Sequence, residues 1–228
     1  MTYSELFKSV KDDYASFFKD FYSFITSIPA LIKKKKVFAA AALVIWVAVF
    51  TFFDNAVTNS ALALKNNFLD SVFGFFHGLG KPKSVFILIA LLYVYGFIFI
   101  KRKGVYFAFK ALRFFLYSGL IVTLLKSIIG RWRPFNGAGA HQFSPFTFGN
   151  NAHLSLPSGD AAIIFSMAFA VQGLFNNTVW KWFCYSVALV TSIGRVYHYQ
   201  HWTSDILLSF FICLFIWYWD EKREASEK

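Results

Sequence analysis

The sequence predicts an all-α fold: a six-span transmembrane helix bundle with an N-terminal interfacial amphipathic helix. Of the 228 residues, 57% are hydrophobic and only 15% are charged, whereas soluble domains carry about 25% charged residues. Several apolar runs approach or exceed the roughly 17–25 residues that a helix needs to cross a bilayer. Basic residues cluster beside these runs, as expected at membrane boundaries. These observations indicate an integral membrane protein.

The N-terminal segment alternates aromatic and charged side chains over residues 1–32, for example Phe17 and Lys19. This spacing favours a helix that lies in the membrane interface and ends near Pro29. A partly disordered segment is the alternative interpretation. We assign residues 1–36 to this segment.

Six apolar runs follow, and we interpret each as a membrane span. They cover residues 37–53, 84–100, 105–129, 161–175, 179–193 and 206–219. The last three runs are short, and we expect the polar stretches at their ends to continue the helices. Residues 54–83 are predicted to form a connection with one short amphipathic helix. The spans define a domain over residues 37–220, followed by a charged cytoplasmic tail, 221–228.

The basic residues predict the orientation of the spans. Four consecutive lysines at 33–36 and three basic residues at 101–103 flank the first and second spans. The positive-inside rule and attraction to anionic lipid place such clusters in the cytoplasm. The loops 54–83, 130–160 and 194–205 then lie on the outer face. The net charge of +11 is explained in this way, and no recognition motif accompanies it, so no nucleic-acid partner is expected.

Three polar stretches share this outer face: KSIIGRWRP, LPSGD and RVYHYQHWTSD. Each lies at the end of a different predicted span, where ionisable residues are candidates for function. Together they supply the candidate site residues: Lys126, Arg133, Ser158, Gly159, Asp160, Arg195, His201 and Asp205.

The third stretch contains a candidate nucleophile. His201 and Asp205 are four residues apart, so on a helix entering the last span they would share one face. A carboxylate bonded to one imidazole nitrogen fixes the tautomer and leaves the other nitrogen free to attack.

The other candidates suit a phosphoryl group. Guanidinium groups, here Arg133 and Arg195, can bind two phosphoryl oxygens at once, and Lys126 adds positive charge. Ser158 and Gly159 begin a predicted span, where backbone amides and the helix dipole favour an anion. Each feature alone has a simpler explanation: a snorkelling cation, a helix cap, or a local surface pair. Their coincidence on one face favours phosphoryl transfer through a phosphohistidine.

The ordered pattern K-x6-RP, PSG and R-x5-H-x3-D resembles the signature of the type-2 phosphatidic acid phosphatase superfamily. Its membrane members are six-span lipid phosphatases, and its soluble relatives include acid phosphatases and vanadium haloperoxidases. The resemblance implies His201 as nucleophile and Asp205 as its orienting partner, and implies no metal or other cofactor. It also implies a set of phosphate-binding residues: Lys126, Arg133, Ser158, Gly159 and Arg195.

The sequence departs from this pattern at two positions. Gly194 stands where the family usually has a serine, which removes one hydroxyl donor. Asp160 stands where the family has the histidine that protonates the leaving oxygen. Asp160 is either an acid that burial keeps protonated, a residue suited to a good leaving group such as phosphate, or the mark of a weakened enzyme. His153 and His198 are alternative acids.

The resemblance and the topology together predict an integral membrane lipid phosphatase of the bacterial inner membrane, with a periplasmic active site and both termini cytoplasmic. A lipid A-like substrate is favoured, because the N-terminal segment resembles that of lipid A 1-phosphatases. Undecaprenyl diphosphate, phosphatidylglycerophosphate and phosphatidic acid are alternative substrates. A lipid phosphotransferase or, because of Asp160, a non-catalytic binder of anionic lipids are alternative functions. The expected partners are the lipid substrate and the bilayer, and no obligate protein partner is implied.

Overall fold

The structure, a computed structural model, describes residues 3–100, 102–137 and 139–226. The outermost two residues of the predicted N-terminal segment and of the predicted tail lie outside the described residues. Lys101 of the second basic cluster lies outside them as well.

The described chain is built from helices. They are α1 (Tyr3–Lys34), α2 (Lys36–Ala48), α3 (Asp54–Ala63), α4 (Asn67–Gly80), α5 (Pro82–Tyr95), α6 (Arg102–Ile129), α7 (Gly159–Val171), α8 (Thr178–Tyr197) and α9 (Thr203–Ser226). Two π-helical turns, Val49–Phe53 and Gly96–Ile100, extend α2 and α5. Two 3-10 turns, Pro134–Asn136 and Asn151–His153, lie in the long loop between α6 and α7.

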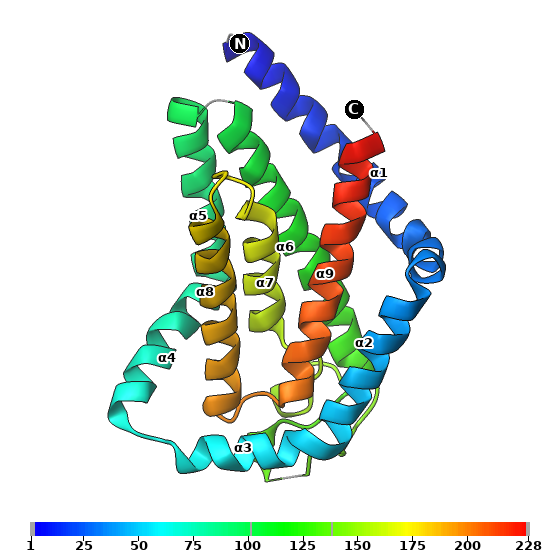
Figure 1. Ribbon diagram of the computed structural model, residues 1–228, viewed down its shortest axis with the longest axis vertical. Helices are drawn as coiled ribbons and strands as arrows, with labels where there is room; N and C mark the ends of the chain where they lie inside the picture. Colours follow the sequence, from blue (N-terminus) through cyan, green and yellow to red (C-terminus); the bar gives the residue numbers. More distant parts are fainter. Residues whose placement is uncertain (1–2, 101, 138, 227–228) are drawn as a thin grey trace.

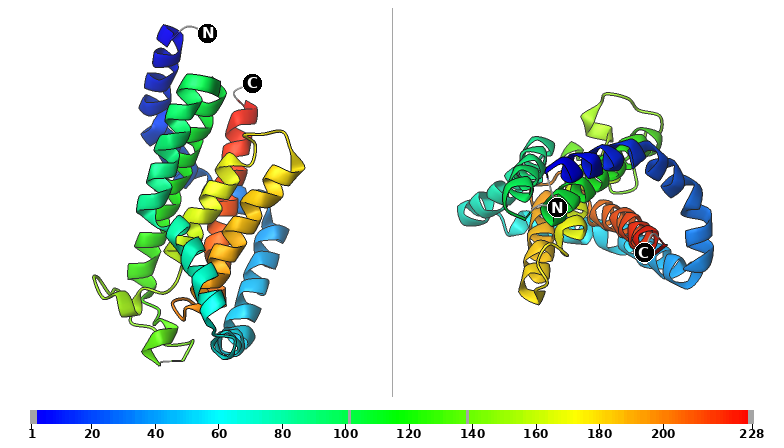
Figure 2. Two further views of the ribbon diagram at one scale, coloured as in Figure 1. Left: turned by 90° about the vertical axis from the view of Figure 1, so that its left-hand side faces the viewer. Right: turned by 90° about the horizontal axis from the view of Figure 1, so that it is seen from above.

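Figures 1 and 2 show helices running up and down the molecule, with both termini at the same end. At the opposite end, α3 lies across the bundle beside the α6–α7 loop and the α8–α9 turn (Figure 1). The three loops predicted for one membrane face therefore do lie at one end of the bundle. We call this the α3 end, and the other the terminal end.

Four helical stretches are long and apolar enough to cross a membrane: Lys36–Ala63, Pro82–Phe99, Lys103–Ile129 and Thr203–Ala225. They correspond to the first three predicted spans and the last one. The chain is thus a multi-pass membrane protein. The helix of the fifth predicted span, α8, is not among these stretches, and α7 has only 13 residues. At 1.5 Å per residue, α7 is about 20 Å long, shorter than the roughly 30 Å hydrocarbon core. Six spans remain a prediction.

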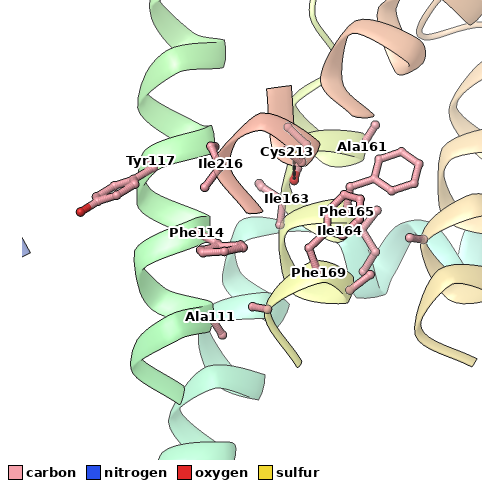
Figure 3. Packing of buried hydrophobic residues seen from close by; sticks show 14 of the residues in the cluster. Ala111, Phe114, Tyr117, Ala161, Ile163, Ile164, Phe165, Phe169, Cys213 and Ile216 are labelled. Atoms are coloured by element: carbon pink, nitrogen blue, oxygen red, sulfur yellow. Dashed lines mark hydrogen bonds between the residues drawn. The ribbon is translucent and has the colours of Figure 1, made fainter. Parts of the chain in front are cut away.

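Helix α7 forms the centre of the bundle. Its sequence is apolar on all sides, which is typical of a helix surrounded by other helices, and most of its residues are buried. Figure 3 shows Ile163 of α7 facing Phe114 of α6 and Ile216 of α9, while Phe165 lies on the other side of α7. This packing fixes the start of α7, with the PSGD motif, in the middle of the α3 end.

The N-terminal helix ends later in the chain than predicted. The segment is helical, but α1 continues through Pro29 to Lys34, although proline removes a helical hydrogen bond. On either side of the proline, Phe24 and Leu31 are buried in the core, and this packing stabilises the helix across it. Its placement in the membrane interface remains a prediction.

Three other boundaries also differ. The connection 54–83 contains two helices, α3 and α4, rather than one. Helix α7 ends at Val171, four residues before the predicted end of that span. Helix α9 continues to Ser226, so the start of the predicted tail extends the last helix.

Candidate active site

The candidate nucleophile lies in the turn between α8 and α9. His201 is not on a helix face with Asp205, as predicted, because α9 begins only at Thr203. The two side chains still meet, since the turn folds back: the amide of Trp202 donates to Asp205 Oδ2 at 2.9 Å. Nδ1 of His201 then lies 3.4 Å from Oδ2 of Asp205. The expected pair forms through a tight turn instead of helical spacing.

Asp205 is fully buried and held by several donors. Nη1 of Arg131 lies 2.6 Å from its Oδ1, and the Ser155 hydroxyl donates to its Oδ2. These contacts leave the carboxylate no freedom to turn away from His201. An orienting carboxylate must be fixed in this way if it is to hold one imidazole tautomer.

Arg131 and Asp54 are site residues that the sequence analysis missed. Arg131 is fully buried, and its Nη2 lies 2.6 Å from Oδ2 of Asp54, at the start of α3. One guanidinium thus bridges the carboxylates of Asp54 and Asp205. Two signals were present: a second arginine in GRWRP, and an acidic residue directly after an apolar run.

Arg133 lies against the other nitrogen of His201. Its Nη1 is 3.4 Å from Nε2 of His201, the atom that faces away from Asp205. Two 2.9 Å hydrogen bonds fix the guanidinium, from Nε to the carbonyl of Asn151 and from Nη2 to its side-chain oxygen. The candidate nucleophile and the first predicted phosphate ligand are therefore neighbours.

Lys126, in the last turn of α6, reaches the start of α7. Its Nζ donates to the carbonyl of Leu154 at 2.6 Å, and its side chain lies alongside Gly159. Lys126 is repelled by Arg133 and Arg195. Within the described part of the chain, no carboxylate lies within 4.0 Å of the Nζ of Lys126 or the guanidinium of Arg133. Two poorly neutralised cations beside a histidine favour an anion.

Ser158 differs from its predicted role. Its amide is not available to a phosphate, because it donates to the carbonyl of Asp205 at 3.2 Å. Its side chain caps α7 by accepting from the amide of Ala161. Gly159 and Asp160 are the first two residues of α7, and their amides have no partner within the helix. The amides of Gly159 and Asp160, rather than that of Ser158, are therefore the ones that remain available to an anion.

Arg195 and Asp160 form an ion pair at the edge of the same cluster. Nε of Arg195 lies 2.9 Å from Oδ2 of Asp160. A third residue joins them that the sequence analysis missed: Nδ1 of His77, on α4, lies 3.5 Å from the same oxygen and 3.0 Å from Nη1 of Arg195. The available signal was a lone histidine in the apolar stretch FGFFHGLG on the outer face.

The two histidines considered as alternative acids have other surroundings. His153 stacks on Trp132 with ring centroids 4.3 Å apart. His198 ends α8 and is influenced by Asp70 and Lys65 as well as by Arg195. Neither makes the contact with Asp160 that His77 makes.

The protonation of His201 suits a nucleophile. Burial lowers the pKa of His201 well below its usual range, against the opposing effect of the nearby Asp205 carboxylate, and the nearby Lys126 and Arg133 lower it further. The imidazole is therefore neutral near pH 7. A neutral imidazole has the free electron pair that attack on phosphorus requires.

The comparisons with known proteins identify the family of the chain. A family model described as the PAP2 superfamily matches residues 107–220, half of the chain. The chain belongs to the PAP2 superfamily. The matched region carries all eight candidate residues predicted from the sequence, and the superfamily includes membrane lipid phosphatases.

One curated relative of this PAP2 protein is a lipid A 1-phosphatase of Rhizobium johnstonii. It is 33% identical over 99 residues, which are 40% of this chain and 37% of the relative. The match thus spans little more than a third of that enzyme's length.

Two solved structures share the fold. A PAP2-type phosphatidylglycerolphosphate phosphatase from Bacillus subtilis has a TM-score of 0.61 at 20% identity, over 94% of this chain and 96% of that one. Aquifex aeolicus LpxE has a TM-score of 0.56 at 22% identity, over 72% of this chain and 93% of that one. These likenesses establish the helical PAP2 fold along most of the chain.

Proposed function

We propose that this PAP2 protein is a lipid phosphatase of the bacterial inner membrane that works through a phosphohistidine, with its active site on the periplasmic face. The observation that carries the proposal is the position of His201. One ring nitrogen faces the buried Asp205 at 3.4 Å, and the other faces Arg133 at 3.4 Å. His201 therefore lies between a carboxylate that can orient it and a guanidinium that can bind a phosphate.

In the first step, Nε2 of His201 attacks the phosphorus of the lipid phosphate, the bond from phosphorus to the lipid oxygen breaks, and the lipid departs with that oxygen. Lys126, Arg133 and Arg195 bind the phosphoryl oxygens and stabilise the charge that develops on them. Asp205 stabilises the charge that the imidazole acquires. In the second step, water attacks the phosphohistidine, and phosphate leaves.

The substrate is proposed to be a lipid A-like phosphate. The lipid A 1-phosphatase of Rhizobium johnstonii supports this choice, since the shared 99 residues are 33% identical. The basic, aromatic N-terminal segment also favours it. The position of the candidate site at the α3 end, on the predicted outer face, supports a substrate whose head group lies at the periplasmic surface.

Phosphate release from purified lipid phosphates tests the proposal. The detergent-solubilised full chain is assayed with lipid A, undecaprenyl diphosphate, phosphatidylglycerophosphate and phosphatidic acid. The His201→Ala variant should release no phosphate above background while keeping its melting temperature, since only the nucleophile is removed. A rapid acid-free quench should trap label from ³²P-lipid on the wild type and not on this variant.

The results separate the alternatives. Transfer of label to a second lipid, rather than to water, would indicate a phosphotransferase. Binding of lipid phosphates without turnover would indicate an anionic-lipid binder and contradict the proposal.

A further inference from the structure

Helix α4 packs unusually closely on α8, and two glycines permit it. A Cβ at Gly194 would lie 3.1 Å from atoms of Phe73 on α4, and a Cβ at Gly80 would lie 2.9 Å from Cγ2 of Thr191 on α8. The distance at Gly194 is tighter than most real Cβ contacts, and the distance at Gly80 is shorter than real Cβ atoms show. The departure from the family pattern at Gly194 therefore has a structural consequence, since it lets α4 approach the site.

The close packing of α4 places a histidine beside Asp160, the second position at which the sequence departs from the family pattern. His77 follows Phe73 by one helical turn and so lies on the same face of α4. Its Nδ1 is 3.0 Å from Nη1 of Arg195 and 3.5 Å from Oδ2 of Asp160. The His77 side chain keeps 27% of its surface exposed, so protons can exchange with water.

The chemistry needs a proton donor at this place. An alkoxide is a poor leaving group and must be protonated as it departs. Asp160 lies 2.9 Å from Nε of Arg195, and a carboxylate in an ion pair has no proton to give. The family's usual histidine is absent from this position in the sequence, yet an imidazole occupies the same neighbourhood from α4.

On the basis of the proposed function, we propose that His77 is the general acid that protonates the leaving oxygen, and that Asp160 is the positioning residue that orients its ring. In this protein the acid would therefore lie on α4, whereas the family's usual histidine lies at the start of α7. Asp160 keeps the place of the usual histidine but acts through His77.

The proton and electron pairs balance over both steps. As Nε2 of His201 bonds to phosphorus, the bond from phosphorus to the lipid oxygen breaks, and its electron pair stays on that oxygen. The proton of the His77 imidazolium goes to this oxygen, so a neutral alcohol departs. Water then attacks phosphorus and gives a proton to His77, while the breaking phosphorus–nitrogen bond returns its electron pair to His201.

Charged groups on three elements face His77 and govern its proton. Arg195 and His198 face it from α8, Asp160 from α7, and Lys81 from the residue before α5. Burial first, and then the charge of Arg195, lower the pKa of His77, while Asp160 acts in the opposite direction. A bound phosphate adds negative charge beside the ring and favours the imidazolium, so the acid is charged when substrate is present.

The test compares two leaving groups on the full chain in detergent. One substrate is a lipid phosphate with an alkyl leaving oxygen, and the other is p-nitrophenyl phosphate, whose nitrophenolate departs without protonation. His77→Gln should lower kcat/KM for the lipid phosphate by about 10²-fold or more and leave kcat/KM for the aryl phosphate nearly unchanged, because this ratio reports the first step and not the attack of water that both substrates share. The alkaline limb of the lipid-phosphate pH profile should also disappear.

A matched control and a rescue complete the test. His198→Gln removes the other histidine beside Arg195 and should leave both rates unchanged. Adding Asp160→His to His77→Gln should restore turnover of the lipid phosphate, because the acid returns to α7. Equal loss of kcat/KM on both substrates, or no loss of kcat/KM on the lipid phosphate, overturns the role of His77. A wild type that hydrolyses neither substrate overturns the proposed function, and this proposal with it.

Discussion

Charged residues gather at both ends of the bundle, but they are paired differently. At the terminal end, three cations meet four acids: Lys110, Arg113 and Arg223 with Asp20, Asp220, Glu221 and Glu224. Every one of these cations has a carboxylate within 3.5 Å. The cluster joins α1, α6 and α9, and its charges satisfy one another.

At the α3 end, the charges are divided into three groups, one of which is the ion pair between Arg195 and Asp160. Arg131 is neutralised by Asp54 and Asp205 in a buried triad. Lys126 and Arg133 contact carbonyl and amide oxygens instead. The comparison teaches where cations without a carboxylate partner occur among the described residues of these two clusters. The cations of the terminal end are all paired and hold helices together, whereas Lys126 and Arg133 beside His201 are available to an anion.

Removal of Arg131 should have the largest effect. Arg131→Met leaves the buried carboxylates of Asp54 and Asp205 without their cation, which costs about 3–5 kcal/mol of folding free energy. Turnover should also be lost, because Asp205 no longer holds His201. Thermal unfolding in detergent and phosphate release measure the two effects. A variant that melts like the wild type would show that the triad is not structural.

Removal of Lys126 should separate activity from stability. Lys126→Met relieves the repulsion from Arg133 and Arg195, so the melting temperature should stay equal or rise. Turnover should fall roughly 10²–10³-fold, as when one donor to a developing oxyanion is removed. Added inorganic phosphate should raise the melting temperature of the wild type and have less effect on the variant. A large drop in stability would contradict the comparison.

Removal of Lys110 should lower stability and leave turnover unchanged, the reverse of the Lys126 variant. Its effect should be the smallest of the three. Lys110→Met takes the closest cation from Asp220 and Glu224, at 3.0 and 2.9 Å. We expect a loss of about 2 kcal/mol, below the usual cost of breaking a buried pair because Arg113 and Arg223 still face Asp220. Turnover per folded molecule should not change. Reduced turnover with normal melting would mean that the terminal end takes part in the reaction.

Features that depend on neighbours in the chain were predictable from the sequence. Apolar runs imply helices, and an even number of predicted crossings between the polar stretches puts them on one face. The order of the three motifs identified the family, and His201, Asp205, Arg133 and Lys126 lie together as expected. Such features follow from local spacing and from the exclusion of polar backbone from the bilayer.

Features that depend on packing between distant segments were not predictable. His201 meets Asp205 through a turn rather than along a helix, and the Ser158 amide is taken by a carbonyl. Arg131 binds Asp54, 77 residues earlier, and Arg195 meets His77, 118 residues earlier. Pairs so far apart leave no periodic signal in the chain. They form because α3 crosses the end of the bundle and because two glycines let α4 settle against α8.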